Sequence, residues 1–175
     1  MKKTALIFIF GFLLFSQSCD EVDELLTFTI KNHTEFEIEN QFPVDTPFNV
    51  PTPDINSQSS QTFESNNTAA SMVNEITLEK LELSIVSPDD FTFSFLKSIE
   101  IYISADNEDQ VMIASKENIP EDATVVDMDT QSQNLRPYLI QDTYDLDFEV
   151  VTREVFARDI TLRADMEYQV KANPL

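Results

Sequence analysis

The segment Ile160-Thr-Leu-Arg-Ala-Asp-Met-Glu-Tyr-Gln-Val170 alternates apolar and polar residues without interruption. Successive side chains of a β-strand point to opposite faces of the sheet, so a period of two predicts a strand with one buried face and one wet face. An amphipathic helix would instead place apolar residues three and four positions apart. The segment therefore predicts a sheet that packs on a core through one face.

The same alternation recurs along the chain, in residues 26–30, 36–39, 81–85, 99–103 and 144–150. No long helical pattern separates these segments, which favours antiparallel sheets packed face to face. We therefore expect an all-β fold: an antiparallel β-sandwich, immunoglobulin-like in outline, with about seven to nine strands and one or two short helical turns. A single domain is expected over residues 25–175.

Local breaks in the alternation predict turns and bulges. Asn32-His33 interrupts the first apolar pattern and predicts an exposed turn. A change of phase at Glu79-Lys80 predicts a β-bulge. Residues 91–95 alternate and predict a further strand. The polar run 105–109 predicts a hairpin loop in which Asp and Asn adopt the left-handed conformation.

Residues 43–68 differ in composition from the rest of the chain, because four prolines and a run of Ser and Gln fall within them. Proline cannot donate to a ladder, so these residues predict an extended or edge segment. Its backbone could bind a partner strand, or its prolines could prevent such pairing; the sequence favours neither. Short helical turns are expected at residues 69–73 and at residues 135–140, the second capped by Ser132.

The first 18 residues have the pattern of an export signal. Lys2 and Lys3 precede an apolar run at residues 5–15, and a short polar stretch, residues 16–18, follows. The apolar run is shorter than the roughly 20 residues needed to span a bilayer. We therefore predict a signal peptide at residues 1–18, whose removal exposes Cys19.

Ser18-Cys19 resembles a lipobox, in which a small residue precedes a cysteine that receives a diacylglyceryl group, although Ser16 stands where an aliphatic residue is usual. Cys19 is the only cysteine, so it has no disulfide partner within the chain. The residues that follow, Asp-Glu-Val-Asp-Glu at 20–24, resemble the acidic export signal of surface lipoproteins in Bacteroidetes-type bacteria. The resemblance implies lipidation of Cys19, an acidic spacer at residues 19–24, and attachment to the outer membrane or cell surface.

Two alternatives stay open for this N-terminus. In many Gram-negative bacteria, Asp20 would favour retention at the inner membrane. An unmodified Cys19 would leave a soluble exported protein with a free thiol. Residues 93–105 and 113–120 also resemble all-β lipoproteins of Bacteroidetes-type bacteria, a group from which no activity transfers.

Charge excludes nucleic acid as a partner. The chain has 11 Lys and Arg against 32 Asp and Glu, and removal of residues 1–18 takes away two lysines and no acid, leaving a formal charge of −23. Proteins bind nucleic acid largely by neutralising phosphates, and they dock on anionic lipid through basic patches. A chain this acidic is unsuited to either. We expect membrane attachment only through the lipid on Cys19.

Composition also excludes several kinds of catalytic and cofactor site. The only glycine is Gly11, within the signal peptide, so the glycine-rich loops that cradle phosphates and the turn that presents a nucleophile are missing in their usual form. His33 is the only histidine, which leaves no His-based triad or zinc site in prospect. We therefore assign no catalytic, cofactor-binding or metal residue and expect no cofactor.

Two acidic clusters are the remaining candidates, as sources of calcium ligands. The first contains Asp106, Glu108 and Asp109; the second contains Asp142, Asp145 and Asp147, with Asp127 and Asp129 possible neighbours. Neither has the spacing of an EF-hand.

We expect a non-enzymatic, surface-anchored binding or assembly module with an unknown protein or glycan ligand. The alternatives are a structural accessory subunit of an envelope complex and an extracytoplasmic hydrolase that uses paired carboxylates.

Overall fold

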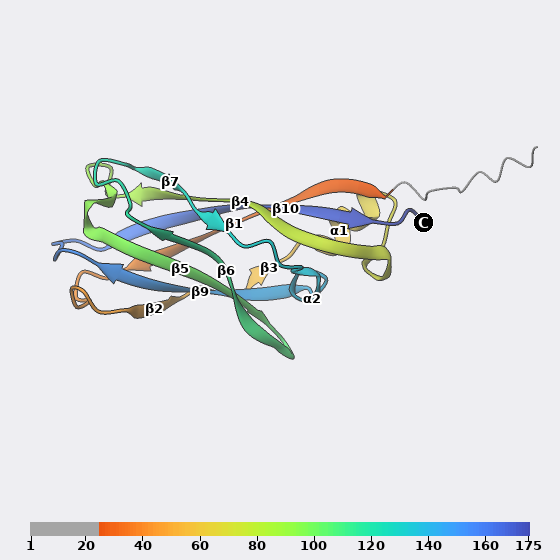
Figure 1. Ribbon diagram of the computed structural model, residues 1–175, viewed down its shortest axis with the longest axis horizontal. Helices are drawn as coiled ribbons and strands as arrows, with labels where there is room; N and C mark the ends of the chain where they lie inside the picture. The colour runs from red at the N-terminus through yellow and green to blue at the C-terminus, as the bar shows by residue number, and fades with distance from the viewer. Residues whose placement is uncertain (1–24) are drawn as a thin grey trace, which may run out of the picture.

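Two antiparallel sheets face each other across one core (Figure 1). The computed structural model describes residues 25–175, so the predicted signal peptide, Cys19 and the acidic spacer up to residue 24 lie outside the described residues. No helix among residues 25–175 is long and apolar enough to cross a membrane.

The smaller sheet has four strands, in the order β1 (Leu26–Ile38), β10 (Ile160–Ala172), β4 (Val73–Ser87) and β7 (Val125–Asp127). The larger sheet has six, in the order β2 (Phe48–Pro51), β9 (Thr143–Thr152), β5 (Leu96–Ala105), β6 (Glu108–Glu117) and β8 (Asp129–Thr130), with β3 (Ile55–Asn56) also paired to β9. The helical turns are α1 (Ser59–Ser65), η1 (Ala70–Met72), η2 (Phe93–Phe95) and α2 (Arg136–Leu139).

The strands pair in a nested order. β1 pairs with β10, β2 with β9, β4 with β7, and β5 with β6, so the earliest strands pair with the latest. This is one long antiparallel hairpin rolled into two sheets, which is the arrangement of a jelly roll. The predicted antiparallel β-sandwich is confirmed. The nested order differs from the expected immunoglobulin-like outline, because both arrangements present one apolar face per strand and only the pairing distinguishes them. The ten strands also exceed the seven to nine expected, since β3, β7 and β8 have only two or three residues each.

The core forms where the inner faces of β10 and β9 meet. Every second residue of β10 from Ile160 to Ala172 is buried, as the alternation in this segment predicts. β9 buries its alternate residues in the same way. Phe36 of β1 stacks on Phe148 of β9, with ring centroids 3.8 Å apart, so this aromatic pair joins the two sheets directly.

The chain turns corners without glycine. Residues 25–175 contain no glycine, and the left-handed positions are occupied by Asp45, Gln58, Asn67, Asn107 and Asn118. Asn and Asp tolerate this conformation because their short polar side chains bond to nearby backbone. Asn107, with φ 63°, lies in the tight turn between β5 and β6, as predicted for this loop.

Some local predictions are confirmed. A register shift on β4 leaves Glu79 without an opposite residue on β10, so the predicted bulge is present. The predicted turn near residues 135–140 is α2. The backbone amide of Arg136, the first residue of α2, donates a hydrogen bond to Asn134 Oδ1 at 3.0 Å, and not to Ser132 as predicted.

Other local predictions are wrong. β1 runs straight through Asn32-His33, because Asn32 faces the core and pairs opposite Met166 in an unbroken ladder. Residues 93–95 form η2 instead of a strand, because Phe95 and Leu96 are consecutive residues that are both buried, which a flat strand does not allow.

The extended conformation predicted for residues 43–68 is correct for β2 and β3 and wrong for residues 59–65. These residues form α1 because they lack proline and because Phe63 can anchor the helix, its ring 6.2 Å from that of Phe28. The helical turn predicted at 69–73 is η1, which is shorter and 3-10 in type.

Replacement of Phe148 by Ala should lower the free energy of unfolding by about 3–5 kcal/mol, since it removes a fully buried ring and its stacking partner's contact. Urea denaturation measures the change. The control is Val155→Ala, at a side chain that is 76% exposed, which should stay within about 0.5 kcal/mol of the parent. Equal losses in the two variants would contradict the assignment of Phe148 to the core.

Candidate functional site

The outer surface of the six-stranded sheet carries a row of carboxylates. Asp145, Asp147 and Glu149 alternate along β9 with core residues, so all three point away from the core. Glu100 lies beside them on β5. All four side chains are half-buried. We call these four residues, Glu100, Asp145, Asp147 and Glu149, the acidic face.

Two of these carboxylates are opposite each other. Glu100 and Glu149 are direct cross-strand partners, and like charges in this relation destabilise a sheet. Tyr102 donates a hydrogen bond from its hydroxyl to Glu100 Oε2 at 2.5 Å. This bond, then burial and the nearby negative charges, raises the pKa of Tyr102 to about 12. The phenol therefore remains a proton donor to Glu100 at neutral pH.

One end of the acidic face joins the two acidic clusters predicted from the sequence. The pKa of Asp145 is raised, first by burial, then by a hydrogen bond with Asp54 and by the charges of Asp54, Asp147 and Asp106. Asp106 belongs to the first predicted cluster and Asp145 and Asp147 to the second, so folding brings them together. Asp54 was missed, because it lies in the proline-rich segment and no pattern in the sequence places that segment beside β9.

The other predicted acids lie elsewhere. Asp127 and Asp129 are in different sheets, where they face Lys80 at 3.7 Å and Lys116 at 3.0 Å. Glu108, Asp109 and Asp142 are exposed in the hairpin between β5 and β6 and in the turn before β9. They contribute backbone contacts, such as the 2.7 Å hydrogen bond from the Tyr138 hydroxyl to the carbonyl oxygen of Asp109.

No three His, Cys, Asp or Glu side chains converge closely enough in the described part of the chain to hold a metal ion. His33 is exposed on the outer side of β1, within a strand and not in the predicted turn. The clusters therefore provide negative charge without a preformed cation cage.

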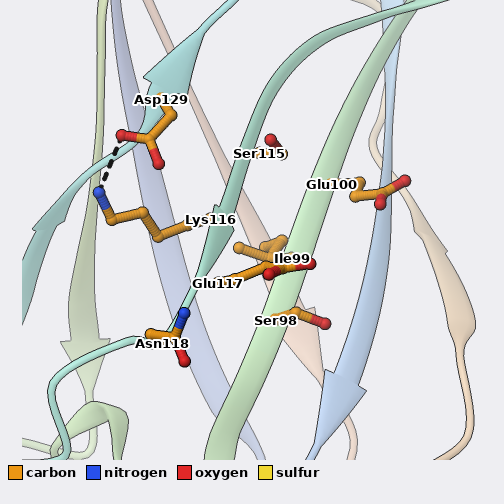
Figure 2. Close-up of a pocket in the computed structure, with 8 residues that line it drawn as sticks. All are labelled: Ser98, Ile99, Glu100, Ser115, Lys116, Glu117, Asn118 and Asp129. Carbon is orange, nitrogen blue, oxygen red and sulfur yellow. Dashed lines mark hydrogen bonds and ion pairs between the residues drawn. The ribbon is translucent and has the colours of Figure 1, made fainter.

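A shallow hollow of about 360 Å³ adjoins Glu100. Figure 2 shows Ser98, Ile99 and Glu100 on β5 beside Ser115, Lys116 and Glu117 on the neighbouring β6, with Lys116 reaching across to Asp129. Only one of its eight lining residues, Ile99, is apolar. Pockets that enclose small molecules are lined mainly by apolar side chains, so this hollow suits contact with a polar surface instead.

The outer face of the four-stranded sheet is also charged, but each of its Lys and Arg side chains forms an ion pair with a neighbouring acid. Cations stand next to acids along the sheet, in the pairs Lys31–Glu167 at 2.6 Å, Arg163–Asp165 at 2.8 Å and Lys171–Glu75 at 2.8 Å. The two sheets therefore differ in charge balance. The acidic face has excess negative charge, whereas the face on the other side of the molecule is a mixed ladder.

Comparison with known proteins assigns this chain to no family and finds only distant structural similarity. No family model matches the chain, and no curated protein matches it. Solved structures that resemble it include one of desmodium yellow mottle tymovirus, with 8% identity and a TM-score of 0.29 over 86% of this chain and 90% of that chain. One of turnip yellow mosaic virus has 12% identity and a TM-score of 0.27 over 86% and 96%. Similarity this distant bears on no functional question.

Replacement of Asp145 by Asn should stabilise the protein at pH 7, by on the order of 0.5 kcal/mol. A carboxylate whose pKa is raised in the folded state destabilises the fold once it ionises, so the gain should shrink as the pH falls toward the ordinary value of 3.8. Urea denaturation at several pH values measures the change.

The matched control is Asp165→Asn on β10. Hydrogen bonds from Arg163 lower the pKa of Asp165, so its ionised form stabilises the fold above pH 3.8 and that contribution is lost as the pH falls through the lowered pKa. This variant should therefore be less stable than the parent at pH 7. If both variants shift stability in the same direction, the charge asymmetry between the sheets is not as described.

Proposed function

We propose that this chain is an exported, lipid-anchored protein whose sandwich domain binds a partner at the bacterial surface without catalysing a reaction. The single observation that carries the proposal is the apposition of Glu100 and Glu149 on a half-buried face with excess negative charge. Such an arrangement lowers the stability of the free protein. A partner that supplies positive charge to the face would offset that cost.

The anchor rests on the sequence of the N-terminus. A charged start, a short apolar run and Cys19 occur in the order of a lipoprotein signal. Two or more acyl chains give stable attachment to a membrane where one chain is marginal. The acidic spacer that resembles the export signal of Bacteroidetes-type surface lipoproteins supports placement at the outer membrane or cell surface.

Electrostatic complementarity favours a cationic partner. A protein segment or glycan that carries amino or guanidinium groups would fit the acidic face and the polar hollow beside it. Nucleic acid and anionic lipid headgroups would be repelled by the same carboxylates. We infer that the ligand contacts the six-stranded sheet rather than the four-stranded sheet.

The geometry favours binding over hydrolysis. Glycosidases hold their two carboxyl groups roughly 5–5.5 Å apart in retaining enzymes and roughly 6.5–9.5 Å apart in inverting ones, with the scissile bond between them. Asp54 lies close enough to Asp145 to raise its pKa, so these two carboxyl groups are neighbours and do not face each other across a cleft. The alternative of an accessory subunit in an envelope complex differs from the proposal by stable co-purification with a membrane protein, which a transient binding module would not show.

The N-terminal peptide from the membrane fraction should begin at Cys19 and carry the mass of a diacylglyceryl group. The lipid attaches through the thiol, so a Cys19→Ala chain should lose this mass and leave the membrane fraction. Mass spectrometry of both proteins measures it. An unmodified peptide that begins at Cys19 would overturn the anchor and leave a soluble exported protein.

Octalysine binding tests the acidic face. The Glu100→Gln/Glu149→Gln variant should bind the peptide about fivefold more weakly at low salt, if each half-buried contact contributes roughly 0.5 kcal/mol. The control, Glu37→Gln/Glu79→Gln, removes the same charge from the four-stranded sheet and should change affinity much less. Calorimetry measures both, and equal weakening would show that net charge alone attracts the peptide.

A further inference from the structure

β1 has one long edge without a strand beside it. Its only ladder is with β10, and no other backbone–backbone hydrogen bond within residues 25–175 involves residues 26–38. All six of its outward-facing side chains from Thr27 to Glu37 are exposed, whereas those of the central strand β10 are half-buried. Among residues 25–175, no strand pairs with this edge along the 13 residues of β1, although residues 53–58 approach it beside Asn32.

The other edge strands of the two sheets are short. β7, β8, β2 and β3 have between two and four residues each, and short edges are a common protection against pairing with another chain. β1 has none of the usual protective features except charge, since it contains no proline and its ladder with β10 has no register shift. A long, regular edge of this kind is a template for strand addition.

The sequence of β1 is complementary to itself. On its outward face, Lys31 and Glu35 lie at equal distances on either side of His33. Two antiparallel copies with His33 at the centre would place Lys31 of each opposite Glu35 of the other. The inward face would then pair Ile30 with Phe36 and Phe28 with Ile38, so that apolar residues meet apolar residues and charges meet opposite charges.

We propose that β1 pairs with β1 of a second copy of this chain, antiparallel and about a twofold axis at His33, which joins the two four-stranded sheets into one. This interface lies on a different sheet from the acidic face and does not depend on it. Symmetric self-pairing of this kind gives a closed dimer rather than a fibre.

An unsatisfied buried atom selects this register. The side chain of Asn32 is buried and its Nδ2 donates to the carbonyl oxygen of Ser57 at 3.2 Å and to the hydroxyl of Tyr144 at 3.0 Å, but its Oδ1 has no donor among the described residues. Leaving a buried acceptor unpaired costs about 1–3 kcal/mol. With His33 at the axis, Asn32 lies opposite Thr34 of the second copy, whose hydroxyl can donate to Oδ1 once the Asn32 side chain turns toward the edge.

The competing registers fit less well. In the neighbouring registers that keep inward-facing residues opposite inward-facing residues, the twofold axis passes through residue 31, 32, 34 or 35 instead of His33. With Lys31 at the axis, the Lys31 side chains of the two copies would face each other. With Glu35 at the axis, the two Glu35 side chains would do the same. Thr34 at the axis pairs the charges acceptably, but it puts Asn32 opposite Phe36, which has no donor. With Asn32 at the axis, Lys31 would face His33 and gain no acid.

The edge also has room for side chains of the second copy. A hollow of about 270 Å³ lies beside Asn32, His33 and Thr34, bounded on its other side by residues 53–56 and Gln58, which include β3. Thr34 and Asn32 of the second copy, opposite Asn32 and Thr34, would point inward along this part of the edge. The hollow therefore lies where the inward-facing residues of an added strand would be placed.

Cysteine cross-linking tests the register. Each variant is made in the full chain with Cys19→Ala, so that the added thiol is the only one. Directly opposite residues have Cα atoms about 4.5–5.5 Å apart, within disulfide range, so His33→Cys should give roughly fivefold more disulfide-linked dimer under mild oxidation than Lys31→Cys, Thr34→Cys or Glu35→Cys. An equal mixture of the Lys31→Cys and Glu35→Cys chains should cross-link to each other.

The parent chain supplies an independent measurement. Sedimentation equilibrium should show a concentration-dependent dimer, and urea denaturation should show that the His33→Cys variant, altered at an exposed position, folds as the parent does. Efficient cross-linking at Thr34→Cys, equal cross-linking at all four positions, or a parent that stays monomeric while His33→Cys forms no dimer would each overturn the proposal. The last result would mean that the edge is covered by a different protein or left open.

Discussion

Burial of one face of each sheet against the other is the constraint on which this structure depends. β10 and β9 place every second side chain in the core, and the stacked rings of Phe36 and Phe148 join the two layers. This packing produces strict alternation on β9 and β10, the two strands at the centre of the sheets. It therefore leaves the outer faces free to carry charge, and the two sheets use that freedom in different ways.

The contrast between the outer faces is the main functional feature. Ion pairs within β10 and between neighbouring strands place cations beside acids on the four-stranded sheet, whereas Glu100 and Glu149 oppose each other on the six-stranded sheet. Each ion pair on an exposed face contributes little to stability, and each apposed like pair costs a comparable amount. The uneven distribution therefore hardly affects folding, but it gives the molecule one strongly negative face and one mixed face.

The nested strand order explains why a single long edge remains. Rolling one hairpin into two sheets places the first strand at the border of the four-stranded sheet, and the chain leaves β1 at Ile38 for the other sheet. The edge strands later in the sequence are short because the chain crosses from one sheet to the other within them. Residues 125–130, for example, contribute β7 to the four-stranded sheet and β8 to the six-stranded sheet. The same topology that covers the core thus leaves β1 at the border of its sheet and buries Asn32, whose amide oxygen has no donor among residues 25–175.

Local chemistry by itself determined the strands, the bulge at Glu79, the glycine-free hairpin at Asn107 and the fold class, because alternation, change of phase and turn residues act within a few positions. Asn32 and Phe95 were misplaced, since a buried Asn looks like a turn residue and a 3-10 turn looks like alternation until its neighbours are known. Only the tertiary structure decided which acids meet. Asp54 and Asp145 are 91 positions apart in the printed sequence, and Asp106 reaches them through a hairpin, so their repulsion arises from strand pairing between distant segments. Nothing within either segment encodes that contact.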